Sequence, residues 1–353
     1  MKSFVYNGMP SRVVFGVGAL DRLADEVETL GAAKALVLST PEQRATAEDV
    51  AKRLGDRAAG VYDQAVMHVP IETAAAAREK ARDLGADCCV AVGGGSTIGL
   101  GKAIALSFGL PIVAVPTTYA GSEMTPIWGL TEAGVKRTGR DMKVLPRTVL
   151  YDPTLTLSLP PAISGPSGMN AIAHCVEALY AEDANPVISL MAAEGIRALA
   201  AALPTVVKTP DDLEARGDAL YGAWLAGASL GSVGMALHHK LCHTLGGSFN
   251  LPHAQTHTIV LPHAAAYNRE AAPDAMERIA AALGGGDAPA GLFDLALGIG
   301  APTALKDIGL KESDLDRAAD LATQNPYYNP RPVTRDAIRA LLDDAYHGRR
   351  PAK

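Results

Sequence analysis

The sequence predicts two domains: an N-terminal α/β domain with a doubly wound parallel sheet, and an all-α C-terminal domain. Three observations predict this division. The chain has 353 residues, more than the roughly 250–300 that one hydrophobic core usually serves. Its first half alternates short β-branched runs with helical stretches, as parallel strands joined by crossover helices do. Beyond Asp152 it is rich in Ala, Leu and Gly at helical spacing, so we expect domains at 1–156 and 157–353.

The individual strands are expected where short apolar runs occur. They are predicted at residues 34–38, 60–62, 88–92 and 111–115, and further strands at 127–131 and 148–151 complete this half. The stretches between them are rich in Ala, Glu, Arg and Leu, which favour helices. The segment 157–161, Leu-Ser-Leu-Pro-Pro, ends the pattern, and loops are expected at 284–286 and 326–332.

Composition excludes several classes of partner. The net charge of −6 comes from interspersed acidic and basic residues, so no broad positive field exists to attract nucleic acid. No apolar run approaches the ~20 residues that a membrane span needs, and the N-terminal stretch lacks the apolar segment of a secretory signal. We therefore expect a cytoplasmic protein without membrane or nucleic-acid partners. Its four cysteines are expected to be small buried hydrophobes.

A glycine-rich turn follows the strand expected at 88–92. Gly93, Gly94, Gly95 and Ser96 lead into a helical stretch that begins at Thr97. Glycines let a backbone approach a ligand closely, and the N–H groups of the following helix suit a pyrophosphate. A simple strand-to-helix turn would have the same sequence. Because the usual G-x-G-x-x-G fingerprint is absent after the strand at 34–38, where Ser39 stands, a dinucleotide would be held by this later loop.

A polar loop follows the strand expected at 111–115. It includes Thr117, Thr118, Tyr119 and Ser122. Ligands of open α/β sheets bind at the carboxyl ends of the strands, and small hydroxyl groups can hydrogen-bond phosphate and ribose. Thr and Ser are also ordinary turn residues, so a turn without a ligand stays open as an alternative.

Histidines are concentrated in the C-terminal half, where six of the nine fall between residues 238 and 263. His239 and His243 are four residues apart and share a helix face, and His253 follows soon after. Asn170 and His174 repeat the spacing on an earlier helix. Converging imidazoles can bind a divalent metal or supply a proton. The remaining three of the six are interpreted as packing residues: His238, His257 and His263.

In their order along the chain, these segments resemble the iron-containing alcohol dehydrogenases, and the resemblance covers nearly the whole sequence. That family pairs a glycine-rich nucleotide-binding domain with a helical domain in which an Asp and three His surround a metal. Dehydroquinate synthase shares this architecture. The positions matching the metal ligands are Asn170, His174, His239 and His253. The resemblance further implies that His243 lies near the nicotinamide and that Lys136 contacts the cofactor ribose.

Two departures from the family pattern resemble one branch of it. The family usually has Asp three residues after the Gly-Gly-Gly-Ser motif, where this chain has Gly99, and Asn170 replaces the Asp ligand. Together with segments 116–129 and 136–153, these changes resemble the maleylacetate reductases. That branch reduces the conjugated carbon–carbon double bond of maleylacetate to 3-oxoadipate during aromatic degradation. The resemblance implies an oxidoreductase that uses NADH or NADPH and forms a homodimer.

The motifs and the resemblance together define the expected site. The residues predicted to bind the cofactor are Ser39, Gly93, Gly94, Gly95, Ser96, Thr97, Thr117, Thr118, Ser122 and Lys136. Those predicted to take part in catalysis are Asn170, His174, His239, His243 and His253. The dicarboxylate substrate is predicted to contact Tyr119, Asn325 and Arg331. The last two lie in a late polar loop that would serve equally well as a surface turn.

Asn170 also bears on the metal. An amide in place of a carboxylate removes a full charge and leaves only neutral ligands. Such a set binds hard Fe(II) or Mg²⁺ poorly, although three imidazoles can still hold Zn²⁺. We therefore predict catalysis without a metal, since hydride addition to an enone produces an enolate that an imidazole can stabilise or protonate.

Three alternatives stay open. A metal-dependent alcohol or polyol dehydrogenase of the same superfamily would hold a divalent ion at His174, His239 and His253. A lyase related to dehydroquinate synthase would use NAD catalytically and leave its net absorbance unchanged. A nucleotide-binding sensor would bind without turnover, although no sequence feature points to one.

Overall fold

The computed structural model describes residues 4, 6, 8, 9, 11–132 and 135–352, except the side chains of residues 135 and 136. It divides into two compact units. One, the α/β unit, comprises Met9–Leu159, and the other, the helical unit, comprises Pro160–Lys353 with Met1–Gly8. The division falls three residues beyond the expected boundary at 156. Each unit is described below by itself.

The α/β unit contains a six-stranded parallel sheet. Its strands are β1 (Arg12–Phe15), β2 (Ala35–Leu38), β3 (Ala58–Tyr62), β4 (Cys88–Gly93), β5 (Ile112–Pro116) and β8 (Thr148–Tyr151). They run in the order β1-β8-β5-β4-β2-β3. Four of the five predicted strands in this sheet differ from their predicted bounds by one or two residues, while β8 has its predicted bounds. The edge strand β1 was not predicted.

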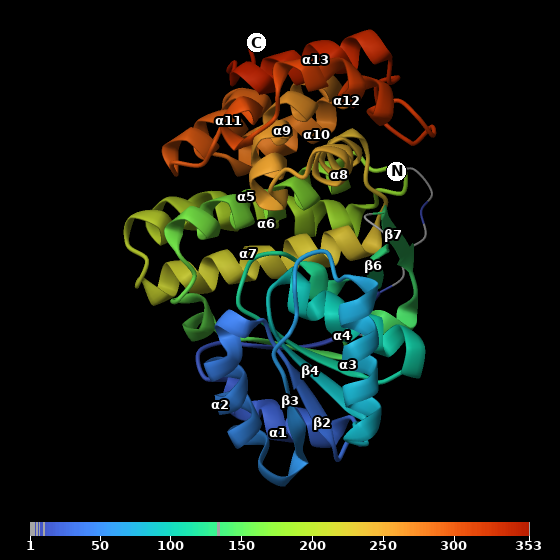
Figure 1. Ribbon diagram of the computed structural model, residues 1–353. Helices are drawn as coiled ribbons and strands as arrows, with labels where there is room; N and C mark the ends of the chain where they lie inside the picture. The colour runs from blue at the N-terminus through green and yellow to red at the C-terminus, as the bar shows by residue number, and fades with distance from the viewer. Residues whose placement is uncertain (1–3, 5, 7, 10, 133–134, 353) are drawn as a thin grey trace. The chain divides into compact units, whose positions relative to one another are not determined.

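Helices cover both faces of this sheet, as the doubly wound fold requires. On one face, Val37 and Val90 pack with the helices α1 (Leu23–Thr29) and α2 (Arg44–Leu54). On the other, Leu36 packs with α3 (Ile71–Asp83) and α4 (Gly95–Phe108). Figure 1 shows α2 and α3 on opposite sides of the strands. Because the central strands are buried on both faces, they form continuous apolar runs, which made them predictable.

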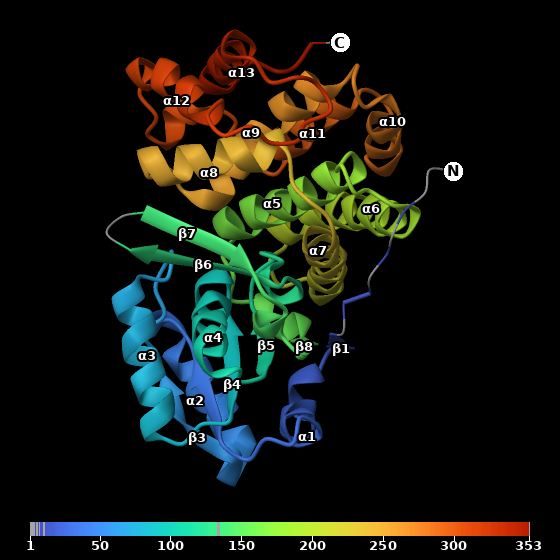
Figure 2. The same cartoon turned by 90° about the vertical axis from the view of Figure 1, so that its right-hand side faces the viewer.

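The strand predicted at 127–131 is present, but it does not join the parallel sheet. It forms β6 (Ile127–Glu132), which pairs antiparallel with β7 (Val135–Arg140) in a separate hairpin (Figure 2). The sequence of β7, VKRTGR, explains this arrangement. A strand with so many polar residues cannot be buried on both faces inside a parallel sheet.

The helical unit confirms the predicted all-α fold. Its helices are α5 (Pro161–Leu179), α6 (Pro186–Lys208), α7 (Leu213–Ser232), α8 (Leu237–Phe249), α9 (His253–Asn268), α10 (Pro273–Ala282), α11 (Ala288–Gly298), α12 (Leu315–Ala322) and α13 (Arg335–His347). The helices α5, α6 and α7 lie side by side. Gly195 of α6 allows a close approach, because a Cβ atom there would lie 2.8 Å from Sγ of Cys175 in α5. Cys175 directly follows His174, a predicted site residue, so this contact holds that part of α5 against α6.

By length and composition, α6 could cross a membrane, and the sharply bent pair α7 and α8 passes the same test only if taken as one span. However, α6 packs between α5 and α7, and 44% of its most apolar stretch is buried. Its remaining surface carries an ion pair between Glu194 and Arg197. These features are those of an amphipathic helix that buries one face against its neighbours in the helical unit.

All four cysteines are unpaired and buried, as predicted. Cys88 and Cys89 lie in β4 of the α/β unit, whereas Cys175 and Cys242 lie in α5 and α8 of the helical unit. Burial raises the pKa of each thiol above its ordinary value. The four side chains therefore act as small apolar groups.

Candidate functional site

In the α/β unit, the strand order reverses between β2 and β4. The connection after β2 leads to β3 on one side of this point, and the connection after β4 leads to β5 on the other. Open α/β sheets bind ligands in the crevice at such a reversal. Ser39 directly follows β2, and the Gly93–Gly95 turn follows β4. Two buried hydroxyl groups here, on Ser39 and Thr97, have no hydrogen-bond partner among the described residues. Because buried polar groups are normally paired, these hydroxyls indicate a place for a polar ligand.

Gly93 is required by this geometry. Its φ is +149°, and a Cβ atom would lie 2.5 Å from Oγ1 of Thr97 and 2.7 Å from Oε1 of Gln43. No side chain fits in that space. The helix α4 begins two residues later and presents its unpaired N–H groups at the same turn. The turn thus leaves room for close approach to its backbone, which is the geometry that a phosphate site requires.

Gln43 was not predicted, yet it links the ends of three strands. It lies in the short turn after β2, and its Nε2 donates a hydrogen bond of 2.9 Å to Oγ1 of Thr117 after β5. Its Oε1 also borders Gly93 at the end of β4. Thr118 packs against Gly94. A Cβ atom added at Gly94 would lie 3.0 Å from the methyl group of Thr118. The predicted residues of the two loops thus do come together.

Residues 117–126, the β5–β6 loop, contain the other predicted side chains of this unit. Ser122 accepts hydrogen bonds from the Lys102 ammonium through its carbonyl (2.7 Å) and its hydroxyl (3.2 Å). Tyr119, predicted to contact substrate, is completely buried. Gly95 is exposed and Ser96 is half-buried at the mouth of the turn. The side chain of Lys136 lies outside the described residues, although its backbone pairs with Thr131 in the hairpin.

In the helical unit, the predicted histidines come from three helices and form one cluster. His174 of α5 and His239 of α8 have ring centroids 5.2 Å apart, and the rings of His239 and His243 are separated by 6.1 Å. His253 joins from α9, with its ring 4.2 Å from that of His257. Asn170 lies one turn before His174 on α5, and its buried Oδ1 has no partner among the described residues.

His238 and His257, interpreted from sequence as packing residues, belong to the same cluster. Their ring centroids are 4.8 Å apart, and a nitrogen from each lies within 4.8 Å of one from His239. His238 is also hydrogen-bonded, since its Nε2 lies 3.0 Å from the carbonyl of His257. Neither ring nitrogen of His257 has a hydrogen-bond partner within the described part of the chain. His263, by contrast, packs edge-on against Phe293.

The cluster has a buried interior and an exposed rim. His174, His239 and His257 are buried, and burial, reinforced by neighbouring imidazoles, lowers their pKa values well below the ordinary value. Burial likewise lowers the pKa of His238 to about 4. His243 and His253 form the exposed rim. The interior rings are therefore neutral at pH 7, and each offers one N–H donor and one lone pair.

Glu177 is the main site residue that sequence reasoning missed. Its carboxylate is fully buried and accepts hydrogen bonds from the backbone N–H groups of Ala236 (2.9 Å) and His238 (2.6 Å) at the start of α8. It also lies 2.7 Å from Nδ1 of His239. Burial raises the pKa of Glu177, whereas His238 and these N–H groups lower it. The spacing Asn170, His174, Glu177 places all three on one face of α5, and this was the available signal.

The carboxylate of Glu177 sets the tautomer of His239. Because Nδ1 of His239 donates to Glu177, its Nε2 carries the lone pair. That Nε2 is buried and has no partner in the residues described, and the same holds for Nδ1 of His174. With Oδ1 of Asn170, the cluster therefore presents three unpaired polar atoms from α5 and α8. Such atoms need a water, an ion or a polar substrate.

These donors do not fit the hard cation that an aspartate-containing set would hold. The atoms offered by Asn170, His174 and His239 are all neutral, and the nearby carboxylate of Glu177 is already occupied by backbone N–H groups and His239. A divalent ion would keep its full charge in a buried place, which is costly without an anionic ligand. Three imidazoles suit Zn²⁺ better than Fe(II).

The late polar loop was predicted to supply Asn325 and Arg331 to the substrate. Both are exposed. The Arg331 guanidinium stacks on Tyr267, with its central carbon 4.3 Å from the ring centroid. Tyr327 of this loop is instead the residue whose hydroxyl is buried, and the nearby charge of Glu177 contributes to raising its pKa. The substrate contacts of Asn325 and Arg331 stay a prediction.

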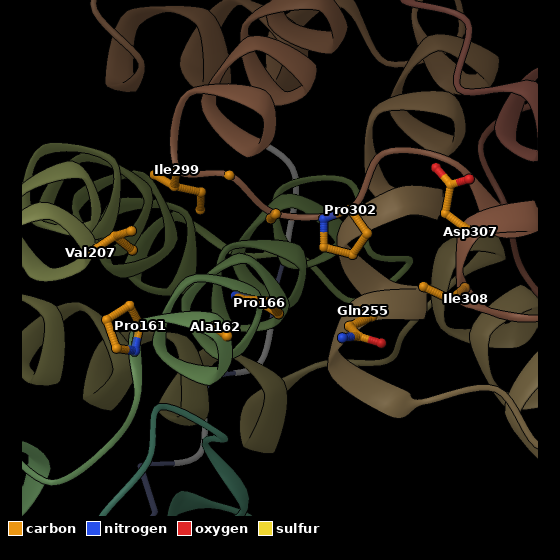
Figure 3. Close-up of a pocket in the computed structure, with 11 residues that line it drawn as sticks. Pro161, Ala162, Pro166, Val207, Gln255, Ile299, Pro302, Asp307 and Ile308 are labelled. Atoms are coloured by element: carbon orange, nitrogen blue, oxygen red, sulfur yellow. The ribbon is translucent and has the colours of Figure 1, made fainter.

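A separate cavity of about 660 Å³ lies in the helical unit. Figure 3 shows its lining, which comes from the start of α5, from α9 and from the segment that follows α11. The lining is mainly Pro, Ala, Val and Ile, with the polar side chains of Gln255 and Asp307. It contains none of the predicted site residues. An apolar wall with one carboxylate does not suit a dicarboxylate, which would be repelled by Asp307.

Comparison with known proteins identifies relatives along the full length. The iron-containing alcohol dehydrogenase family matches residues 10–153, and the C-terminal part of the Fe-containing alcohol dehydrogenase family matches residues 165–346. The chain is 62% identical to the maleylacetate reductase of Burkholderia cepacia and covers 100% of both sequences. It is 59% identical to that of Sphingobium indicum, covering 99% of each. The crystal structure of maleylacetate reductase from Agrobacterium tumefaciens superimposes with a TM-score of 0.97 at 56% identity, covering 99% of this chain and 100% of that one.

Proposed function

The chain belongs to the iron-containing alcohol dehydrogenase family, and we propose that within it the chain is an NAD(P)H-dependent maleylacetate reductase. It reduces the conjugated carbon–carbon double bond of maleylacetate to give 3-oxoadipate. The observation that carries this proposal is the 62% identity to a maleylacetate reductase over 352 residues, with full coverage of both chains. An alcohol or polyol dehydrogenase of the same family is the second candidate, and the neutral donor set around Asn170 argues against it.

The reaction needs a hydride donor and a proton donor. Hydride from the reduced nicotinamide adds to the alkene carbon β to the ketone, and the electron pair of the double bond moves onto the ketone oxygen as an enolate. Protonation of the α carbon then restores the ketone and gives the saturated product. The protein must therefore stabilise the enolate oxygen and deliver one proton.

The imidazole cluster can both stabilise the enolate oxygen and deliver the proton. Its neutral interior rings can donate hydrogen bonds to an oxyanion without carrying a charge of their own. His243 lies on the exposed rim, one turn after His239, and we assign it the transfer of the proton. His253 on the same rim is the reserve candidate. The reduced nicotinamide is assigned to the α/β unit, where Gly93 and the unpaired hydroxyls lie.

The direct test is the choice of substrate. Purified protein with NADH should oxidise the cofactor when enzymatically generated maleylacetate is added, and it should reduce little NAD on a panel of simple alcohols and diols. Rapid turnover of the alcohols without turnover of maleylacetate would favour the second candidate. Unchanged net nicotinamide absorbance during substrate turnover would favour the lyase.

Both NADH and NADPH should support turnover. At the end of β2 stands Ser39, and no carboxylate directly follows it to demand a free 2′-hydroxyl. Arg44, which would favour a 2′-phosphate, is already paired with Glu48 and Asp63. We expect the two kcat/KM values to differ by less than about a thousandfold, or ~4 kcal/mol. A larger ratio in steady-state assays would show that another group of the protein discriminates between the two cofactors.

Catalysis should not depend on a divalent metal. We expect protein that has been exhaustively chelated, and shown by elemental analysis to be free of Zn and Fe, to keep its full rate with maleylacetate. The physical reason is that Asn170 contributes a neutral oxygen where a carboxylate would hold the cation. Activity that disappears on chelation and returns only with Zn²⁺ or Fe(II) would contradict this mechanism.

The variant Asn170→Asp provides the matched control for metal binding. It adds one buried carboxylate oxygen to the unpaired atoms of His174 and His239 and changes little else in volume. The variant should therefore gain affinity for a divalent ion in the same elemental analysis. Equal metal content in the two proteins would show that residue 170 does not determine metal binding.

The remaining features of the proposal concern the setting of the enzyme. It acts on a small dicarboxylate, as a homodimer, in the cytoplasm, and without nucleic-acid or membrane partners. The homodimer is a prediction, which the molar mass of the purified protein from analytical ultracentrifugation tests.

A further inference from the structure

Lys102 is a buried lysine in the α/β unit that the proposed mechanism does not use. It lies on α4, seven residues after Gly95, and therefore on the same helix face as the glycine-rich turn. Its side chain is almost completely buried. Lysines are rarely buried to this extent, because removing an ammonium group from water is costly. A buried lysine needs a specific set of partners to offset that cost.

The partners all belong to the β5–β6 loop or to the first residue of β6. The Nζ atom donates to the carbonyl of Ser122 at 2.7 Å and to that of Ile127 at 2.8 Å. It also lies 2.9 Å from Oγ1 of Thr125 and 3.2 Å from Oγ of Ser122. Four oxygens thus converge on one ammonium group. The contacts span the second half of the loop, so a single side chain fixes the backbone between residues 122 and 127.

A second buried group holds the same loop from the other side. Glu123 is completely buried, and its Oε1 accepts a hydrogen bond of 2.9 Å from the hydroxyl of Tyr151 at the end of β8. Burial lowers the pKa of Lys102 to about 7, and the charge of Glu123 acts in the opposite direction. Lys102 and Glu123 thus both hold the loop, Lys102 through its four oxygen contacts and Glu123 through Tyr151, while the other carboxylate oxygen of Glu123 has no partner among the described residues. Buried polar contacts of this kind restrict the backbone conformations that a loop can adopt.

The first half of the same loop borders the glycine-rich turn. Thr117 donates its backbone N–H to the carbonyl of Gly93 at 3.2 Å, and Thr118 packs on Gly94. A shift in the loop would therefore move hydroxyl groups that face the predicted phosphate site. Loops of this kind are mobile unless tertiary contacts hold them. Lys102 supplies four such contacts from α4, the helix that begins at the glycine-rich turn.

We infer that Lys102 is a positioning residue for cofactor binding, which holds the β5–β6 loop in the conformation that accepts the nicotinamide dinucleotide. The inference rests on the proposed function, because it takes the glycine-rich turn as the cofactor site. Lys102 itself touches neither cofactor nor substrate. Its effect is expected in the affinity for NADH, and not in the chemical step.

The test compares Lys102→Met with the native enzyme. Methionine retains most of the side-chain volume but no donor. We expect the Kd of NADH, from fluorescence titration, and the KM for NADH to rise about 10- to 100-fold, as loss of charge-assisted hydrogen bonds implies. The kcat at saturating NADH and the KM for maleylacetate should change by less than about threefold. Lys80→Met, at an exposed position of α3, is the matched control and should leave all these constants unchanged.

Thr125→Val keeps the experiment decisive if Lys102→Met does not fold. It removes one acceptor of the ammonium with little change of shape and leaves the charge in place. We expect it to raise the Kd of NADH about 3- to 10-fold. Native NADH affinity in a folded Lys102→Met protein, or in Thr125→Val, would overturn the inference. So would a fall in kcat without any change in NADH affinity. A native enzyme that does not bind NADH at all would overturn the proposed function along with it.

Discussion

Replacement of His243 by alanine is expected to lower kcat about 10²- to 10⁴-fold, the usual contribution of a general acid. The ring stands on the exposed rim of the cluster, 6.1 Å from His239, so its loss removes little packing. We therefore expect the free energy of unfolding and the Kd of NADH to stay close to native values. Steady-state kinetics with maleylacetate, together with urea unfolding, measure both effects.

The control for this substitution is His347→Ala. His347 is exposed near the end of α13 and is not part of the cluster, so its loss should leave kcat unchanged. If His243→Ala retained more than a tenth of the native kcat with intact NADH binding, the proton donor would have to be another ring. His253 on the same rim, and then His239, would be examined next.

Replacement of Glu177 by glutamine should reduce both activity and stability. The amide has nearly the shape of the carboxylate, but its NH₂ group would face the backbone donors at the start of α8 or the Nδ1–H of His239. We expect the free energy of unfolding to fall by about 1.5–3 kcal/mol, the range for hydrogen bonds to a charged group. The kcat should fall roughly 10- to 100-fold, because His239 loses the partner that sets its tautomer.

Glu277→Gln is the matched control for that experiment. Glu277 is exposed on α10. Neutralising it should change neither kcat nor the free energy of unfolding measurably. A Glu177→Gln protein with native kcat and native urea midpoint would show that the carboxylate neither orients His239 nor stabilises α8. Loss of stability alone, with full kcat, would limit Glu177 to a structural role.

Most of the fold could be predicted, because its signals are local. The central strands β2, β4 and β5 are buried on both faces and therefore form apolar runs that stand out in the sequence. The edge strand β1 was missed, since four residues between a proline-containing segment and a glycine give little periodicity. The prediction at 127–131 found a strand but could not say that it pairs with β7 in a separate hairpin. Strand propensity does not specify a pairing partner.

The candidate site was predictable where spacing along one helix defines it. Asn170 with His174, and His239 with His243, follow from the four-residue repeat, and the structure brings these rings together. Glu177 was missed because its role depends on being buried against α8, a helix some sixty residues later in the chain. Lys102 was missed for the same reason. A charged residue is assumed to be exposed until a tertiary contact shows otherwise.

The distribution of the four cysteines gives each unit its own chemical reporter of unfolding. Cys88 and Cys89 are enclosed in the α/β unit, and Cys175 and Cys242 in the helical unit. A thiol that is both buried and shifted toward its protonated form reacts with an alkylating reagent only after the surrounding structure opens. The rates at which the two pairs become labelled in mild denaturant therefore measure the opening of the two units separately, within one unmodified protein. A ligand that stabilises only the α/β unit would slow labelling of the first pair and leave the second unaffected.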